Sequence, residues 1–299
     1  MSRVITIFDP WKDPLCTCPP KYTCSPYTGC AHACVYCYIT SYIPRPFVVR
    51  PKKNFIRRLL RDVRRIDPKI PISIANSSDP YTPPEDRLML TRKTLKILTT
   101  RGFKILILTK NTLVLRDLDI ISTGNVAVSI TITTLDPEIA KRIEPNAPDP
   151  NERLIAVRTL AENGVPVIVR IDPIIPYVND DLGMIEDLVS KIIRAGAKHI
   201  VTSTFKARRD SLKRLKALFP EKGDAIMDAY LVHGVRMKRN VFYLSKDLRK
   251  RILGNIAKYV LNEGVSFAVC REGFKEYMKA LSCDGSHLIP LRVRTNHLI

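Results

Sequence analysis

Short apolar runs alternate along the chain with amphipathic segments. The apolar runs are nearly continuous and rich in Val and Ile, which is typical of parallel strands covered on both faces. They span Pro71–Asn76, Lys104–Thr109, Val126–Thr131, Val165–Ile171, His199–Thr204 and Val265–Val269. The amphipathic segments predict helices at Asn54–Ile66, Leu88–Arg101, Asn151–Asn163, Asp180–Ala195, Ser211–Phe219 and Lys246–Asn262. Glycine follows four of these helices, where a left-handed C-terminal cap is common.

The order of these elements predicts an α/β fold in which a β-α unit is repeated about six times. Right-handed crossovers between parallel strands then close the sheet wholly or partly into a barrel. In such barrels the chemistry lies at the C-terminal ends of the strands. Those ends are polar here, at Asn76–Pro80, Thr109–Asn111, Thr131–Asp136 and Arg170–Pro173. We therefore expect a functional site along this edge of the sheet.

Composition narrows the class of protein. The chain has 299 residues, of which 45% are hydrophobic, enough for the core of one large or two modest domains. A disordered chain, a collagen-like fibre and a small disulfide scaffold are excluded. No apolar run approaches the roughly 20 residues that span a bilayer, and Met1–Trp11 does not resemble a secretory signal, so we expect a cytoplasmic protein. The absence of glutamine and the 22 prolines fit a thermophilic origin.

Six of the eight cysteines fall between Cys16 and Cys37. In a chain without an export signal, such crowding indicates a metal or catalytic site, although thermophiles also form intracellular disulfides. The segment Gly29–Tyr38 contains three cysteines spaced C-x3-C-x2-C, which would place three thiolates on three irons of a [4Fe–4S] cube. The fourth iron would then be open to chelate S-adenosylmethionine (SAM). Zinc is the alternative, although zinc sites usually pair two C-x2-C arms.

This motif, followed by β-α units, resembles the radical SAM superfamily and, within it, the group related to spore photoproduct lyase. The segments that carry the resemblance are Cys30–Tyr38, Asn76–Tyr81, Leu108–Asn111, Val128–Pro137, Ile143–Leu154 and Ile171–Pro176. The resemblance implies a partial (βα)6 TIM-like barrel, a [4Fe–4S] cluster, SAM and a reducing electron donor. It divides the chain into an irregular Cys/Pro-rich extension (residues 1–26), the barrel (27–270) and a C-terminal extension (271–299).

The resemblance also implies roles for individual residues. Tyr36 would line the cofactor pocket, Asp172 would close its adenine side, and Tyr38 matches a tyrosine of the lyase's radical relay. Asp172 precedes a proline, so it is also compatible with a turn. The cluster ligands would be Cys30, Cys34 and Cys37.

Further SAM contacts are implied at the ends of three strands. Ser77 and Ser78 would lie near the methionyl amino group, Lys110 would pair with the carboxylate, and Ser129 or Thr131 would reach the ribose. The two serines are also compatible with caps of a turn, Lys110 with a solvated lysine, and Ser129 with a small residue facing the barrel.

The chain departs from the lyase at one position. In the lyase, a cysteine near the end of the strand that matches Pro71–Asn76 returns hydrogen to the product radical. Asn76 stands there in this chain. An amide N–H bond is too strong to donate that hydrogen atom. Repair of the thymine photoproduct by the same route is therefore not expected.

Five cysteines lie outside the motif. We expect an auxiliary iron–sulfur or zinc centre that joins the N-terminal extension to the C-terminal segment. Thermophilic disulfides or buried free thiols are alternatives. The candidate ligands are Cys16, Cys18, Cys24, Cys270 and Cys283, with His287 as a possible substitute.

The formal net charge is +20, which favours a polyanionic partner such as a nucleic acid. Basic segments at Asn54–Ile66, at Lys206–Lys216 and in the tail with Arg292 and Arg294 would form a groove for a phosphate backbone, although each alone is compatible with a solvated surface. Aromatic side chains after the motif would stack on a base or belong to the core, namely Tyr38, Tyr42 and Phe47.

These observations predict a radical SAM enzyme that cleaves SAM reductively and abstracts hydrogen from a nucleic acid base. Radical modification of a peptide or a metabolite is the alternative within the same class. A metal-stabilised nucleic-acid-binding protein without redox chemistry is the alternative from a different class.

Overall fold

A mostly parallel sheet of eight strands forms the centre of the computed structural model, which describes residues 2–9 and 13–292. Seven strands are parallel, and β1 pairs antiparallel with β2 at one edge. The sheet is open, so it forms a partial barrel. The strands, in spatial order, are β1 (Ile5–Ile7), β2 (Tyr22–Cys24), β5 (Ile72–Ile74), β6 (Ile105–Thr109), β7 (Val126–Thr131), β8 (Val167–Ile174), β9 (His199–Thr204) and β12 (Ser266–Val269).

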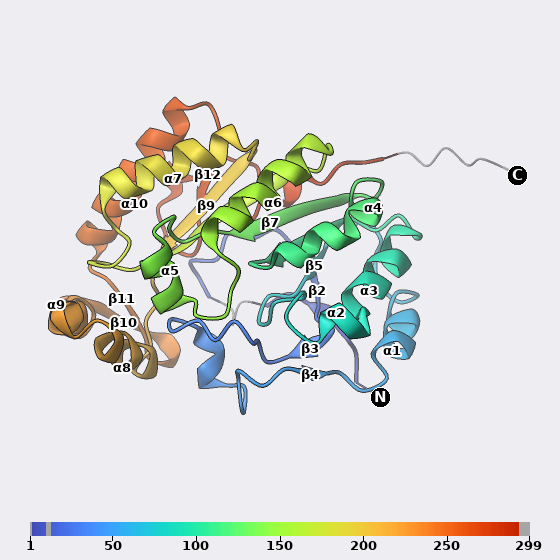
Figure 1. The fold of residues 1–299 in the computed structure, drawn as a ribbon, viewed down its shortest axis with the longest axis horizontal. Coiled ribbons are helices and arrows are strands. Elements are labelled where there is room, and N and C mark those ends of the chain that lie inside the picture. Colours follow the sequence, from blue (N-terminus) through green and yellow to red (C-terminus); the bar gives the residue numbers. More distant parts are fainter. Residues whose placement is uncertain (1, 10–12, 293–299) are drawn as a thin grey trace, which may run out of the picture.

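Helices cover the outer face of this sheet (Figure 1). Two small pairs of strands lie outside it: β3 (Tyr27–Thr28) with β4 (Arg50–Pro51), and β10 (Val235–Met237) with β11 (Val241–Tyr243). The helices are α1 (Phe55–Asp62), α2 (Glu85–Leu88), α3 (Leu90–Thr99), α4 (Leu118–Ile121), α5 (Pro137–Ile143), α6 (Pro150–Glu162), α7 (Leu182–Arg194), α8 (Arg209–Leu218), α9 (Pro220–Leu231) and α10 (Lys246–Asn262).

The predicted α/β architecture is confirmed. The strands β7 and β9, both fully buried, occupy the ranges that the sequence predicts, and the other four predicted strands differ at their ends by one to three residues. The structure adds β2, which pairs with β5 and therefore brings part of residues 1–26 into the sheet. The division of the chain at residues 26 and 270 stays a prediction.

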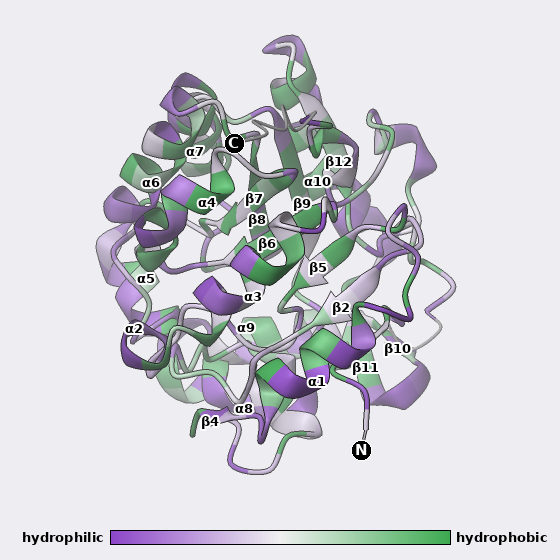
Figure 2. Ribbon diagram, turned by 90° about the vertical axis from the view of Figure 1, so that its right-hand side faces the viewer, coloured by the Kyte–Doolittle hydropathy of each residue, from purple (hydrophilic) through white to green (hydrophobic). Residues whose placement is uncertain are grey.

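Apolar residues concentrate in the strands and on the inner faces of the helices, while the outer faces of the helices are hydrophilic (Figure 2). In α1, Leu59 is fully buried and Val63 nearly so, as the amphipathic pattern predicts. The same pattern predicts that Leu60 is buried, but it is exposed, because it lies beside arginines rather than against the sheet. Among the described residues, no helix is both long and apolar enough to cross a membrane.

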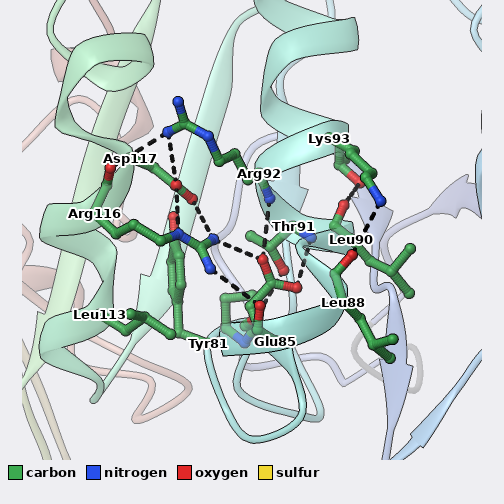
Figure 3. A network of polar contacts seen from close by, with 12 residues as sticks. Tyr81, Glu85, Leu88, Leu90, Thr91, Arg92, Lys93, Leu113, Arg116 and Asp117 are labelled. Atoms are coloured by element: carbon green, nitrogen blue, oxygen red, sulfur yellow. Dashed lines mark hydrogen bonds and ion pairs between the residues drawn. The ribbon is translucent and has the colours of Figure 1, made fainter.

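A buried carboxylate fixes the start of α3. Glu85 is completely buried and accepts hydrogen bonds from the backbone N–H of Thr91 (2.8 Å) and from the guanidinium of Arg116 (2.7 Å) (Figure 3). The hydroxyl of Tyr27 in β3 donates to the same carboxylate at 2.5 Å. The carboxylate of Glu85 in α2 therefore joins β3, α3 and the segment of Arg116, and these contacts hold the loop between β5 and α3 in place.

The C-terminal segment fills the inside of the barrel. Cys283 and Ile289 pack in one buried cluster with a residue from each of five neighbouring strands, namely Leu106, Ala127, Ile168, Val201 and Ala268. Gly285 allows this close approach: its φ is +77°, and a Cβ atom there would lie 2.3 Å from Cγ1 of Ile168. Only glycine meets both conditions without displacing its neighbours.

We expect Gly285→Ala to lower the free energy of unfolding, measured by urea denaturation under anaerobic conditions. Gly264→Ala is the matched control, because Gly264 also has positive φ (+73°) but a Cβ atom there would meet no other atom within 4 Å. The control should lower the free energy of unfolding by about 1–2 kcal/mol, because alanine is strained in the left-handed backbone conformation. Gly285→Ala should cost about 1–3 kcal/mol more, because it also overpacks the barrel. Equal losses would contradict the proposed packing.

Candidate functional site

The cysteine loop runs from β3 to a short 3-10 helix (Tyr38–Ser41) and is fixed on several sides. The backbone N–H of Val35 donates to the carbonyl of Ile143 (2.9 Å), and Arg214 on α8 donates from Nε to the carbonyl of Val35 (2.9 Å). The N–H of Cys30 donates to the carbonyl of Pro46 (2.8 Å). The loop is therefore positioned by α5, α8 and its own C-terminal continuation.

The three cysteine thiols of the loop are close enough to act on one another electrostatically. Burial raises the pKa of all three thiols, to about 12 for Cys30 and well above the ordinary value for Cys34. Lys110 opposes this rise at Cys34 and Cys37. The backbone N–H groups of Asp79 and His32 donate to the sulfur of Cys30. Such hydrogen bonds and a nearby cation favour the thiolate form that iron requires.

This set of donors fits an iron–sulfur cluster. No group of three or more His, Cys, Asp or Glu side chains in the described part of the chain is arranged to hold a single metal ion. A cube does not require such convergence, because it spreads its thiolates over separate irons. The three thiols on one anchored loop therefore match the chemistry of the cluster that the sequence predicts.

Glu144, just after α5, lies at the centre of a buried network beside the loop. Its carboxylate pairs with Arg153 of α6 and accepts the hydroxyl proton of Tyr36. Thr133 donates to the same carboxylate at 3.2 Å, and Nζ of Lys110 lies 3.9 Å from Oε1. Burial opposes the charge of Glu144, but Arg153, Lys110 and Tyr36 outweigh it and lower the pKa. The carboxylate therefore stays ionised and orients two residues predicted to contact SAM.

Asp79 forms a second buried network, after β5. Its carboxylate accepts hydrogen bonds from Oγ1 of Thr109 (2.8 Å) and from the backbone N–H of Lys110 (2.7 Å) and Tyr81 (2.9 Å). Nε2 of His32 faces it at 3.2 Å. Burial opposes the charge of Asp79, but His32 and the N–H donors lower its pKa. Asp79 thus joins the cysteine loop to the end of β6.

The predicted SAM contacts at the strand ends differ in their surroundings. Ser129 is buried inside the barrel, and its Oγ has no hydrogen-bond partner. Thr131 is also buried, and its carbonyl accepts from Arg153 at 3.2 Å. Ser77 hydrogen-bonds the hydroxyl of Tyr42. Ser78 instead contacts Ser25 (2.9 Å between the hydroxyl oxygens), so its hydroxyl is engaged by the segment after β2.

Tyr38 and Asn76 are in direct contact. The hydroxyl of Tyr38 donates to the backbone carbonyl of Asn76 at 2.5 Å, and its ring stacks on Tyr42 with the centroids 6.1 Å apart. The side-chain amide of Asn76 donates to Oγ1 of Thr23 in β2 at 2.6 Å. The structure thus places the predicted relay tyrosine beside the position where the lyase has its hydrogen donor.

Asp172 lies away from the Glu144 network, at the end of β8. It pairs with Arg170 and accepts from Oγ of Ser203 at 2.6 Å. Burial opposes its charge, but Arg170 and Lys206 lower its pKa. Arg170 also acts on Tyr38, so the two groups of predicted residues border the same edge of the sheet.

The basic segments are partly used inside the protein. Arg214 holds the cysteine loop, Lys206 pairs with Glu272 (3.1 Å), and Lys216 pairs with Asp224, so the segment Lys206–Lys216 is not a uniform solvated face. Four arginines in α1 and just after it line a surface hollow of about 330 Å³ with Leu60, namely Arg57, Arg61, Arg64 and Arg65, and Arg61 also pairs with the buried Asp62 at 2.8 Å. In the tail, Arg292 donates to the carbonyl of Gly164 at 2.8 Å, and Arg294 lies outside the described residues.

Sequence reasoning missed the residues that hold the site together. Glu144 and Asp79 lie inside the segments that carry the family resemblance, yet the sequence alone predicts no role for them. Their partners are far away in the sequence, as in the contact between Tyr36 and Glu144, 108 residues apart. His32, within the motif itself, was also not singled out. A carboxylate directly before a proline was the available signal, in Asp79–Pro80 after β5 and in Glu144–Pro145 after α5.

Comparison with known proteins agrees with this geometry. Residues 24–189, more than half of the chain, match the model of the radical SAM superfamily. An uncharacterized protein of Methanocaldococcus jannaschii is 36% identical over 167 residues, which cover 54% of this chain and 62% of that protein. One of Mycobacterium tuberculosis is 29% identical over 196 residues, which cover 60% of this chain and 57% of that protein. The matched region thus spans less than two thirds of these relatives.

Solved structures show the same fold. A spore photoproduct lyase mutant with bound AdoMet and dinucleoside spore photoproduct has a TM-score of 0.67 at 16% identity, over 83% of this chain and 75% of that chain. Streptococcus suis SuiB bound to S-adenosylmethionine has a TM-score of 0.55 at 14% identity, over 83% of this chain and 49% of that chain. At these identities the likeness concerns the fold alone. Together with the match over residues 24–189, it establishes that the chain belongs to the radical SAM superfamily of enzymes.

Proposed function

We propose that this protein cleaves SAM reductively and abstracts a hydrogen atom from a base of a nucleic acid. The observation that carries the proposal is the partly buried cysteine loop, held beside Lys110 and Glu144 at the C-terminal edge of the sheet. An exposed pair of stacked tyrosines, Tyr38 and Tyr42, lies immediately after this loop. The site therefore combines ligands for a cluster with a surface for an aromatic substrate.

We assign different residues of the chain to binding the cluster and to binding SAM. The proposed cluster ligands are Cys30, Cys34 and Cys37. Bound there, a [4Fe–4S] cluster would supply the electron that splits SAM into methionine and a 5′-deoxyadenosyl radical. Lys110 would pair with the methionyl carboxylate, and Glu144 would hold the lysine in place. Tyr36, whose hydroxyl is fixed by Glu144, would form a wall of the pocket.

The ribose and adenine would lie further along the strand ends. The unpartnered hydroxyl of Ser129 supports a contact with a polar ligand, because buried polar atoms are nearly always hydrogen-bonded. Thr131 and Asp172 border the same edge. Ser77 remains a candidate for the methionyl amino group, while the contacts of Ser78 with Ser25 favour a structural role.

Charge and aromatic surface support the choice of substrate class. Tyr38 and Tyr42 are 36% and 46% exposed, and a base would stack on exposed aromatic surface of this kind. Arg170 and Arg271 act on Tyr38, and Arg208 acts on Tyr42. A base on the tyrosines would lie beside these cations, of which Arg170 and Arg271 are paired with Asp172 and Asp13.

The remaining expectations belong to the same proposal. The side chain of Asn76 has no bond to hydrogen that is weak enough for hydrogen-atom donation. Photoproduct repair by the lyase's route is therefore not part of the proposed function. A cytoplasmic location and an electron donor follow from the chemistry, because the cluster needs a reducing environment. The auxiliary iron–sulfur or zinc centre is a separate proposal, since its cysteines lie outside the loop.

Anaerobically prepared protein should be brown and should form 5′-deoxyadenosine from SAM when reduced. Replacing any one of Cys30, Cys34 and Cys37 by Ala should reduce this product to background, measured by chromatography, because each thiolate binds a different iron. Cys24→Ala is the control: Cys24 is fully buried but lies in β2, outside the loop, and the variant should keep the activity. Colourless, zinc-loaded protein without SAM turnover would refute the enzyme proposal.

Glu144→Gln should destabilise the fold by about 3–5 kcal/mol at pH 7, because it leaves the charges of Arg153 and Lys110 buried without their partner. The lowered pKa of Glu144 makes its contribution complete above its ordinary value of 4.5, and the contribution disappears as the pH falls through the lowered pKa. Urea denaturation at several pH values should therefore show the variant approaching the wild type in acid. Glu138→Gln, on the exposed face of α5, is the control. It should change neither the free energy of unfolding at pH 7 nor its dependence on pH.

The logarithm of the binding constant for a labelled oligonucleotide should fall linearly with the logarithm of the salt concentration, because phosphate contacts release counterions. The double variant Arg64→Ala/Arg65→Ala, in the hollow of α1, should reduce the slope by about 2, or about 1 per phosphate contact. Arg158→Ala, an exposed arginine of α6, should leave the slope unchanged. Salt-independent binding, or none, would favour a peptide or metabolite as the substrate.

A further inference from the structure

Four of the five cysteines outside the loop lie together, although they come from three distant parts of the chain. The sulfur atoms of Cys18 and Cys283 are 3.3 Å apart across a separation of 265 residues. Cys16 is within hydrogen-bond distance of Cys18. Cys270, at the end of β12, is near enough for its charge to act on Cys16, Cys18 and Cys283. Cys24 is not part of this group, because it lies in β2 beside Lys52 and Asp62.

The group lies on the inside of the barrel. Cys283 belongs to the buried cluster formed with inward-facing residues of five strands, and Cys18 and Cys270 pack against that cluster. Cys283 is buried, while Cys16, Cys18 and Cys270 are partly exposed, so the apolar cluster shields the group in part. Several thiols held together beside an apolar wall are a favourable set of ligands for a metal.

Other contacts bring the same segments together independently of the cysteines. Lys21 and Asp284 form a buried ion pair between the N-terminal and C-terminal segments. Nε of Arg271 donates to Asp13 at 2.7 Å, which ties the residue after Cys270 to the segment before Cys16. The cysteines are thus held near one another by the fold, as the ligands of a metal site are.

Two cations face the group. Lys21, which is fixed by its buried pair with Asp284, acts on Cys18. Arg170 hydrogen-bonds Cys270, so a second cation faces the group from β8. Thiolate sulfur is the preferred ligand of zinc and of iron–sulfur clusters. Four cysteines complete the ligand set of either one.

We propose that Cys16, Cys18, Cys270 and Cys283 bind a second metal centre, which fastens the N-terminal segment to the C-terminal segment inside the barrel. The four thiols are neighbours, but no three of them yet surround one ion. The same holds for the three cysteines of the loop. A tetrahedral zinc site would require the side chains to rotate about their Cα–Cβ bonds, and a cube would need less convergence. His287, a possible substitute, is engaged by Ser282 at 2.7 Å.

The test is the metal content of full-length protein prepared anaerobically, measured by elemental analysis together with acid-labile sulfide. A variant with Cys30, Cys34 and Cys37 all replaced by Ala removes the loop site. It should retain either about one zinc or about four irons per chain. Zinc without sulfide would identify a single ion, and iron with sulfide would identify a cluster. In that background, adding Cys18→Ser and Cys283→Ser should remove the remaining metal, and adding Cys24→Ala should not.

A second measurement does not depend on the folding of variants. In wild-type protein, the four cysteines should resist alkylation until a chelator removes the metal, and mass spectrometry should then find all four labelled. A Cys18–Cys283 disulfide in the anaerobic protein would overturn the proposal, as would a loop variant that folds but holds no metal. SAM cleavage is assayed separately, so failure of the second centre is distinguishable from failure of the radical SAM activity.

Discussion

The buried charge of Glu144 is the interaction on which the arrangement of the site depends. The residue is 2% exposed, and its carboxylate is ionised because Arg153, Lys110 and the hydroxyl of Tyr36 all face it. These partners come from α6, from the end of β6 and from the cysteine loop. A charge without water must be matched by groups in fixed positions, so the requirement of one carboxylate places three segments relative to one another. Asp79 does the same for the loop, β5 and β6.

A consequence is that the protein prepares the site before any cofactor is bound. Movement of the loop away from the strand ends would remove the hydroxyl of Tyr36 from Glu144 and the ring of His32 from Asp79 while both carboxylates stay buried, which costs about 1–3 kcal/mol for each lost contact. Lys110 is held by both networks, through its N–H to Asp79 and its ammonium group near Glu144. A lysine fixed in this way loses little side-chain entropy when it binds a carboxylate. If Lys110 pairs with the methionyl carboxylate, as we propose, the fold supplies part of the orientation of SAM before binding.

The sequence was sufficient to predict most of the sheet. β7 and β9 are buried on both faces, so an uninterrupted apolar run marks each of them. β2 was missed because Tyr22–Cys24 is only three residues long and lies among prolines and cysteines; its pairing with β5 makes it a strand. The helix α5 was missed as well, although Asp136 and Pro137 are an N-cap and first-turn pair.

The cysteine loop was predictable for a different reason, since three ligands of one cluster lie close together in the sequence. The networks around it were not, because carboxylates such as Glu144 have partners that only the fold brings near. The group of four cysteines shows both limits. Its members could be named from the sequence, but the exclusion of Cys24 depends on the direction in which β2 enters the sheet.

The net charge of +20 also gains meaning from these buried groups. Seven acidic side chains in the described part of the chain are buried, namely Asp62, Asp79, Glu85, Asp117, Glu144, Glu272 and Asp284. The buried lysines and arginines there are fewer, namely Lys21, Arg153 and Arg249. Burial therefore removes more negative than positive charge from the surface. The net charge stays +20, but fewer acidic side chains are left on the exterior than the composition alone indicates, because these seven hold the interior together, in part by pairing with partly exposed cations such as Arg61, Arg116 and Lys206.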